Sequence, residues 1–350
     1  MEQTVGVIGA GAWGTAVAIS LARAGHKVEI WAREEDVCAS INRQHENSRF
    51  LPGYKTPENL TASGDICAVA GGKNFLILAS PSLYLAKTVQ GILDVPGVRD
   101  GSTCIGILTK GFIPSETGPR LIVETLEDVL PPVYRRNLVY IAGPSHAEEV
   151  ALGKITGLVA ACENAMNSIR FRELLRSKGL LVYSSLDIIG VQICAAAKNV
   201  IAVAFGILDA ISENSDRFGD NTQSLLLAAG LNEMLTLGRA MNASHPETFT
   251  SIAGVGDLDV TCRSKFGRNR KFGQDIIRNG ILQKFSDLDD LIARISEIGY
   301  LPEGAVACKY VHIISGMYDL KMPISNGLFR ILNKEAEPLE FIEKLLDGEI

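Results

Sequence analysis

A single lysine interrupts a long apolar segment in the second half of the chain, and this lysine is the first candidate for chemistry. Lys198 is the only charged residue from Val191 to Val203. If the segment is helical, the residues on the same face are Cys194, Ala195, Ile201 and Ala202, all apolar. Burial disfavours the charged form of a lysine, so such a side chain can act as a general base. The alternative is a lysine whose stem carries the ammonium group to the surface, and the segment leaves both open.

Three other charged residues stand at positions that suit a ligand site. Lys110 follows an apolar strand, where a lysine faces either a crevice or plain solvent. Asp257 lies in a glycine-rich turn, and it can pair with Lys198 or cap the next helix. Arg268 begins a basic run after Gly267, and its guanidinium can clamp a phosphate or carboxylate bidentately. A solvated basic turn is the alternative for that run.

Metal and triad chemistry are not indicated. The five histidines show no metal-ligand spacing, and no serine–histidine–aspartate arrangement is apparent. His146, in a Gly-Pro-Ser-His turn, is the one histidine placed to touch a ligand. We therefore expect no metal site.

The chain begins with a glycine pattern that predicts dinucleotide binding. An apolar strand from Thr4 runs into G-x-G-x-x-G at Gly9, Gly11 and Gly14, followed by a helical stretch and a second strand from Lys27. In such a unit the first glycine makes a tight turn and the second lets the backbone approach a pyrophosphate. The third allows close helix–strand packing, and the helix N-terminus faces the phosphates.

The end of the second strand leaves the choice between NAD and NADP open. An acidic residue about 20 positions past the glycines binds a ribose 2′-hydroxyl, whereas an arginine favours a 2′-phosphate. The strand ends in Arg33, Glu34 and Glu35, so both residue types are present. Because Arg33 lies closer to the strand end, we favour NADP slightly.

The elements that must position these residues fall into two groups. Strands are predicted at 75–79, 103–108, 138–141, 158–161 and 180–183, alternating with helices such as 83–93, 116–130 and 165–177. From Asp187 onward helices replace strands, at 188–211, 223–241, 270–279, 287–299, 305–315 and 337–346. We expect an α/β fold with a doubly wound, largely parallel Rossmann domain at residues 1–187 and an all-helical domain at 188–350. The active-site cleft is expected between them.

Composition limits the partners and the compartment. The net charge of −6, with no dominant basic cluster, argues against nucleic acid or an anionic membrane. The first strand begins by residue 4, which leaves no room for a leader, and the apolar run Val200 to Leu208 is too short to span a bilayer. Seven scattered cysteines without a C-x-x-C pair suit a reducing compartment. We expect a cytoplasmic protein.

Several ordered motifs together resemble the NAD(P)-dependent glycerol-3-phosphate dehydrogenase family of the bacterial type. They are GAGAWGTAVA at 9–18, FLPG at 50–53, LTKG at 108–111, AGPSHAEEVA at 142–151, AAKNVIA at 196–202, AGVGDLDVTC at 253–262, GRNRKFG at 267–273 and MPI at 322–324. The resemblance implies hydride transfer that interconverts sn-glycerol 3-phosphate and dihydroxyacetone phosphate. It also implies reduction for phospholipid synthesis and a homodimer.

The resemblance also assigns roles to residues. Lys198 matches the family's general acid/base, Lys110 a lysine shared by substrate and cofactor, and Asp257 the carboxylate that tunes the catalytic lysine. The remaining substrate-binding positions are Gly143, Ser145, Thr261, Arg268 and Asn269, with Arg268 also near the cofactor. The remaining dinucleotide positions are Ala12, Trp13, Arg33, Ala147, Leu301 and Glu303.

Two features depart from the bacterial pattern. Gly267 stands where bacterial members usually carry serine, so we expect a lost side-chain contact but retained activity. The stretch Ser212 to Asp216 resembles an insertion that lengthens a loop.

Two other functions remain as alternatives: a 2- or 3-hydroxyacid dehydrogenase of similar layout, and a catalytically silent dinucleotide sensor.

Overall fold

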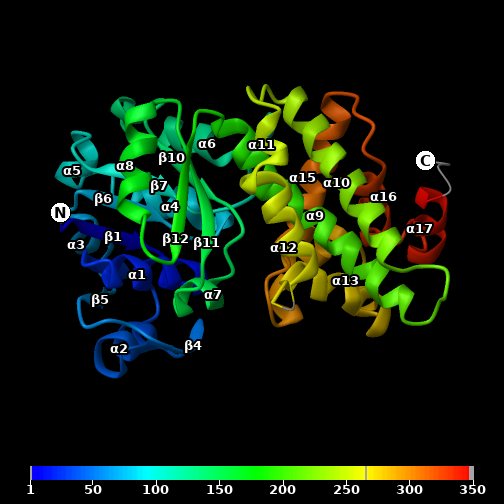
Figure 1. Ribbon diagram of the computed structural model, residues 1–350, viewed down its shortest axis with the longest axis horizontal. Helices are drawn as coiled ribbons and strands as arrows, with labels where there is room; N and C mark the ends of the chain where they lie inside the picture. The colour runs from blue at the N-terminus through cyan, green and yellow to red at the C-terminus, as the bar shows by residue number, and fades with distance from the viewer. Residues whose placement is uncertain (1, 265, 347–350) are drawn as a thin grey trace. The chain divides into compact units, whose positions relative to one another are not determined.

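The computed structural model describes residues 2–264 and 266–346, which form two compact units (Figure 1). The first unit, called here the N-terminal unit, holds Met1–Ile113 and Arg120–Gln192. The second, called here the helical unit, holds Pro114–Pro119 and Ile193–Ile350.

An eight-stranded sheet forms the centre of the N-terminal unit, in the order β12-β11-β10-β7-β6-β1-β2-β5. Its strands are β1 (Thr4–Ile8), β2 (Lys27–Trp31), β5 (Leu60–Ser63), β6 (Phe75–Leu78), β7 (Cys104–Ile107), β10 (Val139–Ala142), β11 (Thr156–Ala161) and β12 (Leu180–Ser185). All neighbours are parallel except β10 and β11. The expectation of a largely parallel sheet is confirmed.

Helices cover this sheet as a doubly wound fold requires. They are α1 (Ala12–Arg23), α2 (Glu35–Gln44), α3 (Ile66–Ala70), α4 (Ser82–Gln90), α5 (Pro96–Arg99), α6 (Ile122–Val129), α7 (Ala147–Leu152), α8 (Ala165–Leu175) and the 3-10 turn η1 (Pro132–Tyr134). Helix α1 packs against α7 and α8, and α4 packs against α6. The central strands β1, β6, β7 and β10 are almost fully buried, whereas the edge strand β12 is exposed at alternate positions.

Two glycines of the opening motif are required by the fold itself. Gly9 has a φ of +127°, and a Cβ there would lie 2.8 Å from the backbone of Ala79 and Ser80. A Cβ on Gly14 would lie 2.1 Å from the carbonyl oxygen of Gly9. The tight turn and the close helix–strand packing predicted for these two positions are therefore confirmed.

The predicted helix at 116–130 is wrong in its first part. The chain forms a hairpin of β8 (Phe112–Ser115) and β9 (Gly118–Leu121) before α6 begins at Ile122. Gly118 has a φ of +120°, and Pro119 follows it, so a helix cannot pass through this point. A second short hairpin, β3 (Glu46–Asn47) with β4 (Leu51–Lys55), was not predicted.

The helical unit is built around α9 (Ile188–Ser212). This 25-residue helix is long and apolar enough to cross a membrane by length and composition, but 94% of its most apolar window is buried inside the structure. The helix predicted at 188–211 is confirmed, whereas the expectation that no apolar stretch is long enough to span a bilayer is wrong by length alone. Its burial identifies α9 as a core helix.

The other helices of this unit confirm the predicted all-helical character. They are α10 (Asp220–Ala240), α11 (Glu247–Thr250), α12 (Asp257–Arg263), α13 (Arg268–Arg278), α14 (Leu288–Ala293), α15 (Glu303–Met317), α16 (Pro323–Leu332) and α17 (Pro338–Leu346), with short turns η2 (Ile252–Gly256), η3 (Ile281–Lys284) and η4 (Ile295–Ile298). The helix predicted at 287–299 is instead α14 and η4, and α16 was not predicted. The fold class expected from the sequence is confirmed.

A buried carboxylate caps α16. Glu233, on α10, accepts hydrogen bonds from the backbone N–H of Ile324 and Ser325 and from the Ser325 hydroxyl, the last at 2.7 Å. Burial raises the pKa of Glu233 from 4.5 to about 7, although these hydrogen bonds oppose the rise. The carboxylate therefore satisfies the first turn of α16 at the cost of a buried charge.

Glu233 should make the stability of the fold depend on pH. Because the folded-state pKa is raised, its contribution to stability is fully present below pH 4.5 and is lost as the pH rises through about 7. The unfolding free energy of the wild type should fall relative to that of Glu233→Gln over this range, by about 3 kcal/mol. Denaturant unfolding at a series of pH values measures the difference. If the unfolding free energies of the two proteins changed with pH in parallel, the pKa of Glu233 would be the same in the folded and the unfolded protein.

Candidate functional site

Lys198 lies inside the helical unit and is paired with Asp257. Its side chain, on α9, is 4% exposed, and its Nζ donates a hydrogen bond to Oδ1 of Asp257, which is 1% exposed. The pairing of Asp257 with Lys198, one of the two roles expected for Asp257, is confirmed. The alternative in which the stem of Lys198 carries its ammonium group to the surface is wrong. A buried ammonium next to a carboxylate is a group whose protonation state the protein can control.

A glycine-rich turn places Asp257 at the start of α12. The turn η2 precedes it, and a Cβ on Gly254 would lie 2.0 Å from the carbonyl oxygen of Phe249. One helical turn later, Thr261 donates a hydrogen bond to the backbone oxygen of Asp257 at 2.6 Å, and its hydroxyl lies 3.5 Å from Asp257 Oδ1. Thr261 is therefore next to the lysine–aspartate pair.

Asn269 joins three helices of the same unit. It lies in the first turn of α13, donates to Oδ1 of Asn199 at 2.9 Å, and accepts from the backbone N–H of Gly304 at 2.8 Å. Since Asn199 follows Lys198 directly, Asn269 is held beside the lysine. Sequence reasoning did not single out Asn199, and its adjacency to Lys198 was the available signal.

Arg268 is the exposed first residue of α13. Its neighbour Arg270 is instead half-buried and ion-paired with Asp209, so the solvated basic turn is the wrong description for that part of the run. Gly267 precedes the helix, and a Cβ there would lie 2.9 Å from the carbonyl oxygen of Thr261. A serine at this position would require the turn between α12 and α13 to shift.

The predicted residues of the N-terminal unit follow the carboxyl ends of parallel strands. Lys110, half-buried, follows β7, and the preceding Thr109 donates to the backbone oxygen of Ser80 at 2.7 Å. Ser80 donates in turn to the oxygen of Ile8 at 3.2 Å, so the ends of β1, β6 and β7 are tied together. These junctions lie at the edge where such folds bind ligands.

A second loop at this edge follows β10. Gly143 has a φ of +138°, and a Cβ on it would lie 2.7 Å from the oxygen of Gly157. The Ser145 hydroxyl donates to the oxygen of Gly143 at 2.8 Å, and Ala147 is buried at the start of α7. The predicted substrate loop is thus a tight turn fixed by its own backbone.

The glycine motif has room for a dinucleotide. Gly11 has φ −66° and ψ 175°, which any residue can adopt, and a Cβ there would meet no atom within 4 Å. Neither the backbone nor packing requires a glycine here, whereas close approach of a ligand does. The indole N–H of Trp13 is buried, with no hydrogen-bond partner among the residues that the structure describes. Both observations fit a pyrophosphate at the start of α1, beside Ala12.

The remaining predicted cofactor residues lie at element ends. Arg33 follows β2, is exposed, and forms an ion pair with Glu34 at 3.0 Å. Leu301 precedes α15, and Glu303 is its first residue. The structure thus divides the predicted residues between its two units. Lys110, Gly143, Ser145 and the glycine motif belong to the N-terminal unit, and Lys198, Asp257, Thr261, Arg268 and Asn269 to the helical unit.

A cavity of about 470 Å³ in the N-terminal unit includes none of these residues. Its lining contains four cations: Arg23, Lys154, Arg176 and Lys178. The C-terminal ends of α1, α7 and α8 meet there, and Arg23 donates to the oxygen of Ala151 in α7. Cations stabilise helix C-termini, so this basic cluster has a structural explanation.

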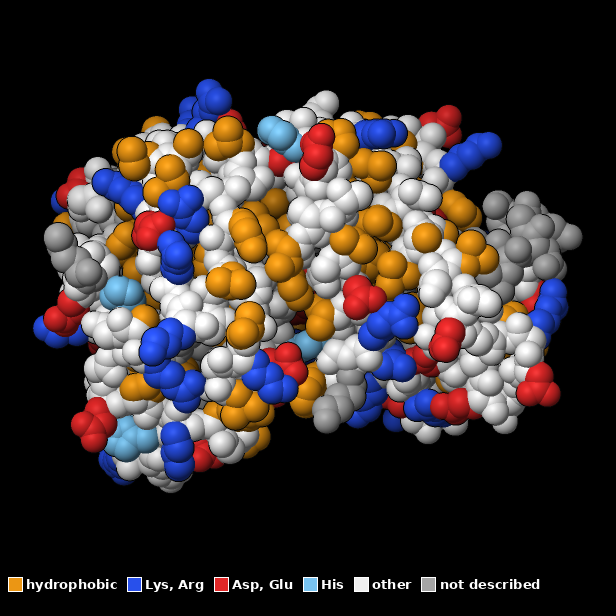
Figure 2. Space-filling view, viewed as in Figure 1, with side chains coloured by type: hydrophobic (Ala, Val, Ile, Leu, Met, Phe, Trp, Pro, Cys, Tyr) orange, Lys and Arg blue, Asp and Glu red, His pale blue; other side chains and the backbone are white. Residues whose placement is uncertain are grey.

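The face shown in Figure 2 and the metal-binding residue types of the described residues indicate no further site. Lys, Arg, Asp and Glu side chains are interspersed on the face in Figure 2, with no continuous basic field. Within residues 2–264 and 266–346, no group of three or more His, Cys, Asp or Glu side chains is placed to hold a metal ion.

Comparison with known proteins gives a consistent result over the whole chain. Residues 4–168 match the family model described as NAD-dependent glycerol-3-phosphate dehydrogenase N-terminus, and residues 187–343 match the corresponding C-terminus model. The chain is 59% identical to the glycerol-3-phosphate dehydrogenase [NAD(P)+] of Treponema denticola, over 100% of this chain and 99% of the relative. It is 52% identical to that of Treponema pallidum, over 98% and 99% of the two chains.

A solved structure extends the likeness to three dimensions. The crystal structure of glycerol-3-phosphate dehydrogenase from Coxiella burnetii superimposes with a TM-score of 0.85 at 31% identity. The match covers 99% of each chain.

Proposed function

Because the chain belongs to the NAD-dependent glycerol-3-phosphate dehydrogenase family, we propose that it interconverts dihydroxyacetone phosphate and sn-glycerol 3-phosphate, with NAD or NADP as the hydride carrier. The observation that carries the proposal is the buried Lys198–Asp257 pair. A secondary alcohol must lose its hydroxyl proton as the hydride leaves, and a buried lysine can take that proton. The nicotinamide, when bound, supplies or accepts the hydride at C2 of the substrate.

Lys198 is the proposed acid/base. In the direction of reduction its ammonium group donates a proton to the carbonyl oxygen, and in oxidation its neutral amine removes the hydroxyl proton. Asp257 favours the charged form of the lysine, while burial favours the neutral form. These opposed influences let Lys198 serve both directions. Lys110, a second cation from the N-terminal unit, is proposed to contact substrate and cofactor.

Arg268 and Asn269 are proposed to hold the substrate phosphate. A dianion on a protein of net charge −6 needs a local cation, which the guanidinium of Arg268 supplies. The N-terminus of α13 adds free backbone N–H groups as hydrogen-bond donors. Ser145 and the backbone at Gly143 are proposed to bind the rest of the substrate, with Thr261 beside the lysine. The dinucleotide is proposed to lie on Gly11 and the first turn of α1.

The proposed roles of the two domains follow the sequence prediction. Residues 1–187 bind the dinucleotide, and residues 188–350 bind the substrate and contain the catalytic residues. We further propose that the protein is a cytoplasmic homodimer without membrane insertion, and that it supplies glycerol 3-phosphate for phospholipid synthesis.

A substrate panel tests the proposed function. The protein should oxidise NADPH or NADH with dihydroxyacetone phosphate, and not with unphosphorylated dihydroxyacetone or with 2-oxo acids at equal concentration. Turnover of a 2-oxo acid in preference would support the hydroxyacid dehydrogenase. Cofactor binding without turnover of any compound would support the silent sensor.

Arg33 is expected to shift the cofactor preference toward NADP, because its guanidinium stands at the end of β2, where a 2′-phosphate lies in such folds. Arg33→Ala should lower the ratio of kcat/KM for NADPH to that for NADH by about 10-fold, the value of one charge-assisted hydrogen bond. Steady-state kinetics with both cofactors measure it. Arg43→Ala, an exposed cation on the neighbouring helix α2, is the control. An unchanged ratio in Arg33→Ala would show that Arg33 does not determine the cofactor preference.

A further inference from the structure

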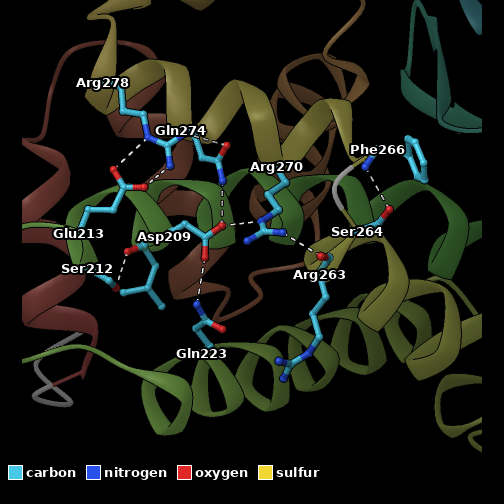
Figure 3. A network of polar contacts seen from close by, with 11 residues as sticks. Asp209, Ser212, Glu213, Gln223, Arg263, Ser264, Phe266, Arg270, Gln274 and Arg278 are labelled. Atoms are coloured by element: carbon cyan, nitrogen blue, oxygen red, sulfur yellow. Dashed lines mark hydrogen bonds and ion pairs between the residues drawn. The ribbon is translucent and has the colours of Figure 1, made fainter.

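A buried aspartate near the end of α9 lies outside the predicted site. Asp209 is 8% exposed, in a helix that is otherwise largely apolar. Its carboxylate accepts hydrogen bonds from three side chains: Gln223 on α10 at 2.9 Å, Gln274 on α13 at 3.0 Å, and Nε of Arg270 on α13 (Figure 3). A carboxylate buried to this extent requires its cation, and it is therefore committed to Arg270.

Arg270 connects three helices through one guanidinium. Its Nε binds Asp209 on α9, and its Nη1 donates to the backbone oxygen of Arg263 at 2.8 Å (Figure 3). Arg263 is the last residue of α12, the helix that begins with Asp257. The ion pair thus joins α9, which carries Lys198, to α12 and α13.

Two glycines bring α9 and α13 into backbone contact. A Cβ on Gly206 would lie 1.9 Å from the oxygen of Arg270, and a Cβ on Gly273 would lie 2.1 Å from the oxygen of Val203. Such contact fixes the distance between the helices. Along the helix axes, the polar contacts of Asp209 with Arg270 and Gln274 add a constraint to that of the Asn269–Asn199 hydrogen bond.

We propose that Asp209 is a positioning residue for the substrate phosphate. Through Arg270 it sets the axial position of α13, whose first two residues are Arg268 and Asn269. This inference rests on the proposed function of that pair. Displacement of α13 would move Arg268 away from the phosphate and strain the Asn269–Asn199 hydrogen bond, while Lys198 stays on α9.

The same interface contains a matched control. Glu213, the residue after α9, forms an exposed ion pair with Arg278 at the other end of α13 (Figure 3). It belongs to the stretch 212–216 that the sequence marked as an insertion. Exposed pairs of this kind contribute little, so Glu213→Gln should leave catalysis unchanged.

The experiment compares Asp209→Asn, Glu213→Gln and the wild type in steady-state kinetics, and measures binding of inorganic phosphate by calorimetry. We expect Asp209→Asn to raise KM for dihydroxyacetone phosphate and Kd for inorganic phosphate by about 10-fold or more. Its kcat and its KM for NADPH should stay within about threefold, and Glu213→Gln should match the wild type. Arg270→Lys, which keeps the charge but not the forked geometry, should show the same pattern. The double variant Asp209→Asn/Arg270→Lys should be no worse than either single variant, because both act through one contact.

Two results would overturn the inference. One is a lower Tm in Asp209→Asn with unchanged KM and phosphate Kd, which indicates a purely structural role. The other is an equal loss of phosphate binding in Glu213→Gln, which indicates a general effect of the interface. If the wild type itself fails to reduce dihydroxyacetone phosphate, the proposed function fails. The calorimetric comparison then still decides whether Asp209 controls anion binding at this site.

Discussion

Replacing Lys198 by alanine is expected to lower kcat for dihydroxyacetone phosphate reduction by about 10³-fold, the typical value of a positioned proton donor. The ammonium group of Lys198 is the proposed proton donor beside Asp257, so without it the carbonyl oxygen would lose its proton source. NADPH should still bind, because the proposed dinucleotide contacts lie largely in the N-terminal unit. Steady-state kinetics and fluorescence titration with NADPH measure the two effects separately.

The same substitution also removes the charge partner of a buried carboxylate, which costs about 3 to 5 kcal/mol in comparable sites. The double variant Lys198→Ala/Asp257→Asn separates the two consequences, because it removes both charges. Its Tm should return toward that of the wild type while kcat stays low. Recovery of activity in the double variant would show that Lys198 is needed only to neutralise Asp257.

Replacing Gly11 by valine is expected to abolish measurable NADPH binding, with Kd raised at least about 100-fold, and to leave the fold intact. The Cβ of valine would have no atom within 4 Å other than those of its chain neighbours, and the backbone angles of Gly11 are ordinary for valine. A bulky group there blocks the approach of a pyrophosphate to the backbone. Calorimetry with NADPH and a thermal melt of the protein alone provide the measurements.

Gly14→Ala is the matched control for this prediction. Its Cβ would lie 2.1 Å from the oxygen of Gly9, so it should lower the Tm of the protein without ligand. Gly11→Val should not lower it by more than a few degrees. Tight NADPH binding by a well-folded Gly11→Val protein would contradict the placement of the dinucleotide.

Local patterns explain what the sequence could predict. The turn at Gly9 and the packing of Gly14 depend on residues a few positions apart, and the strand–helix alternation follows from hydrophobic periodicity. The hairpin of β8 and β9 was missed because the apolar pattern of 116–130 resembles a helix. Gly118 and Pro119 prevent a helix at this point, and such glycine and proline signals override an apolar periodicity.

Contacts between helices that are far apart in the chain explain what the sequence could not predict. Lys198 and Asp257 are 59 residues apart, and their pairing depends on how α12 packs against α9. Asp209 and Arg270 are 61 residues apart, and Asn269 binds groups on both α9 and α15. The sequence therefore identified candidate residues, but it left open whether Lys198 was buried, and it gave no sign of Asp209.

Transfer of an isotope label shows directly whether the protein moves a hydride from the nicotinamide to C2 of dihydroxyacetone phosphate. The protein is incubated with dihydroxyacetone phosphate and NADPH carrying deuterium at the transferring position of the nicotinamide, and the product is analysed by mass spectrometry and NMR. We expect sn-glycerol 3-phosphate with one deuterium at C2, formed in equal amount to the NADP produced. NADPH consumption without labelled glycerol 3-phosphate, or no consumption by a protein that binds both ligands, would contradict it.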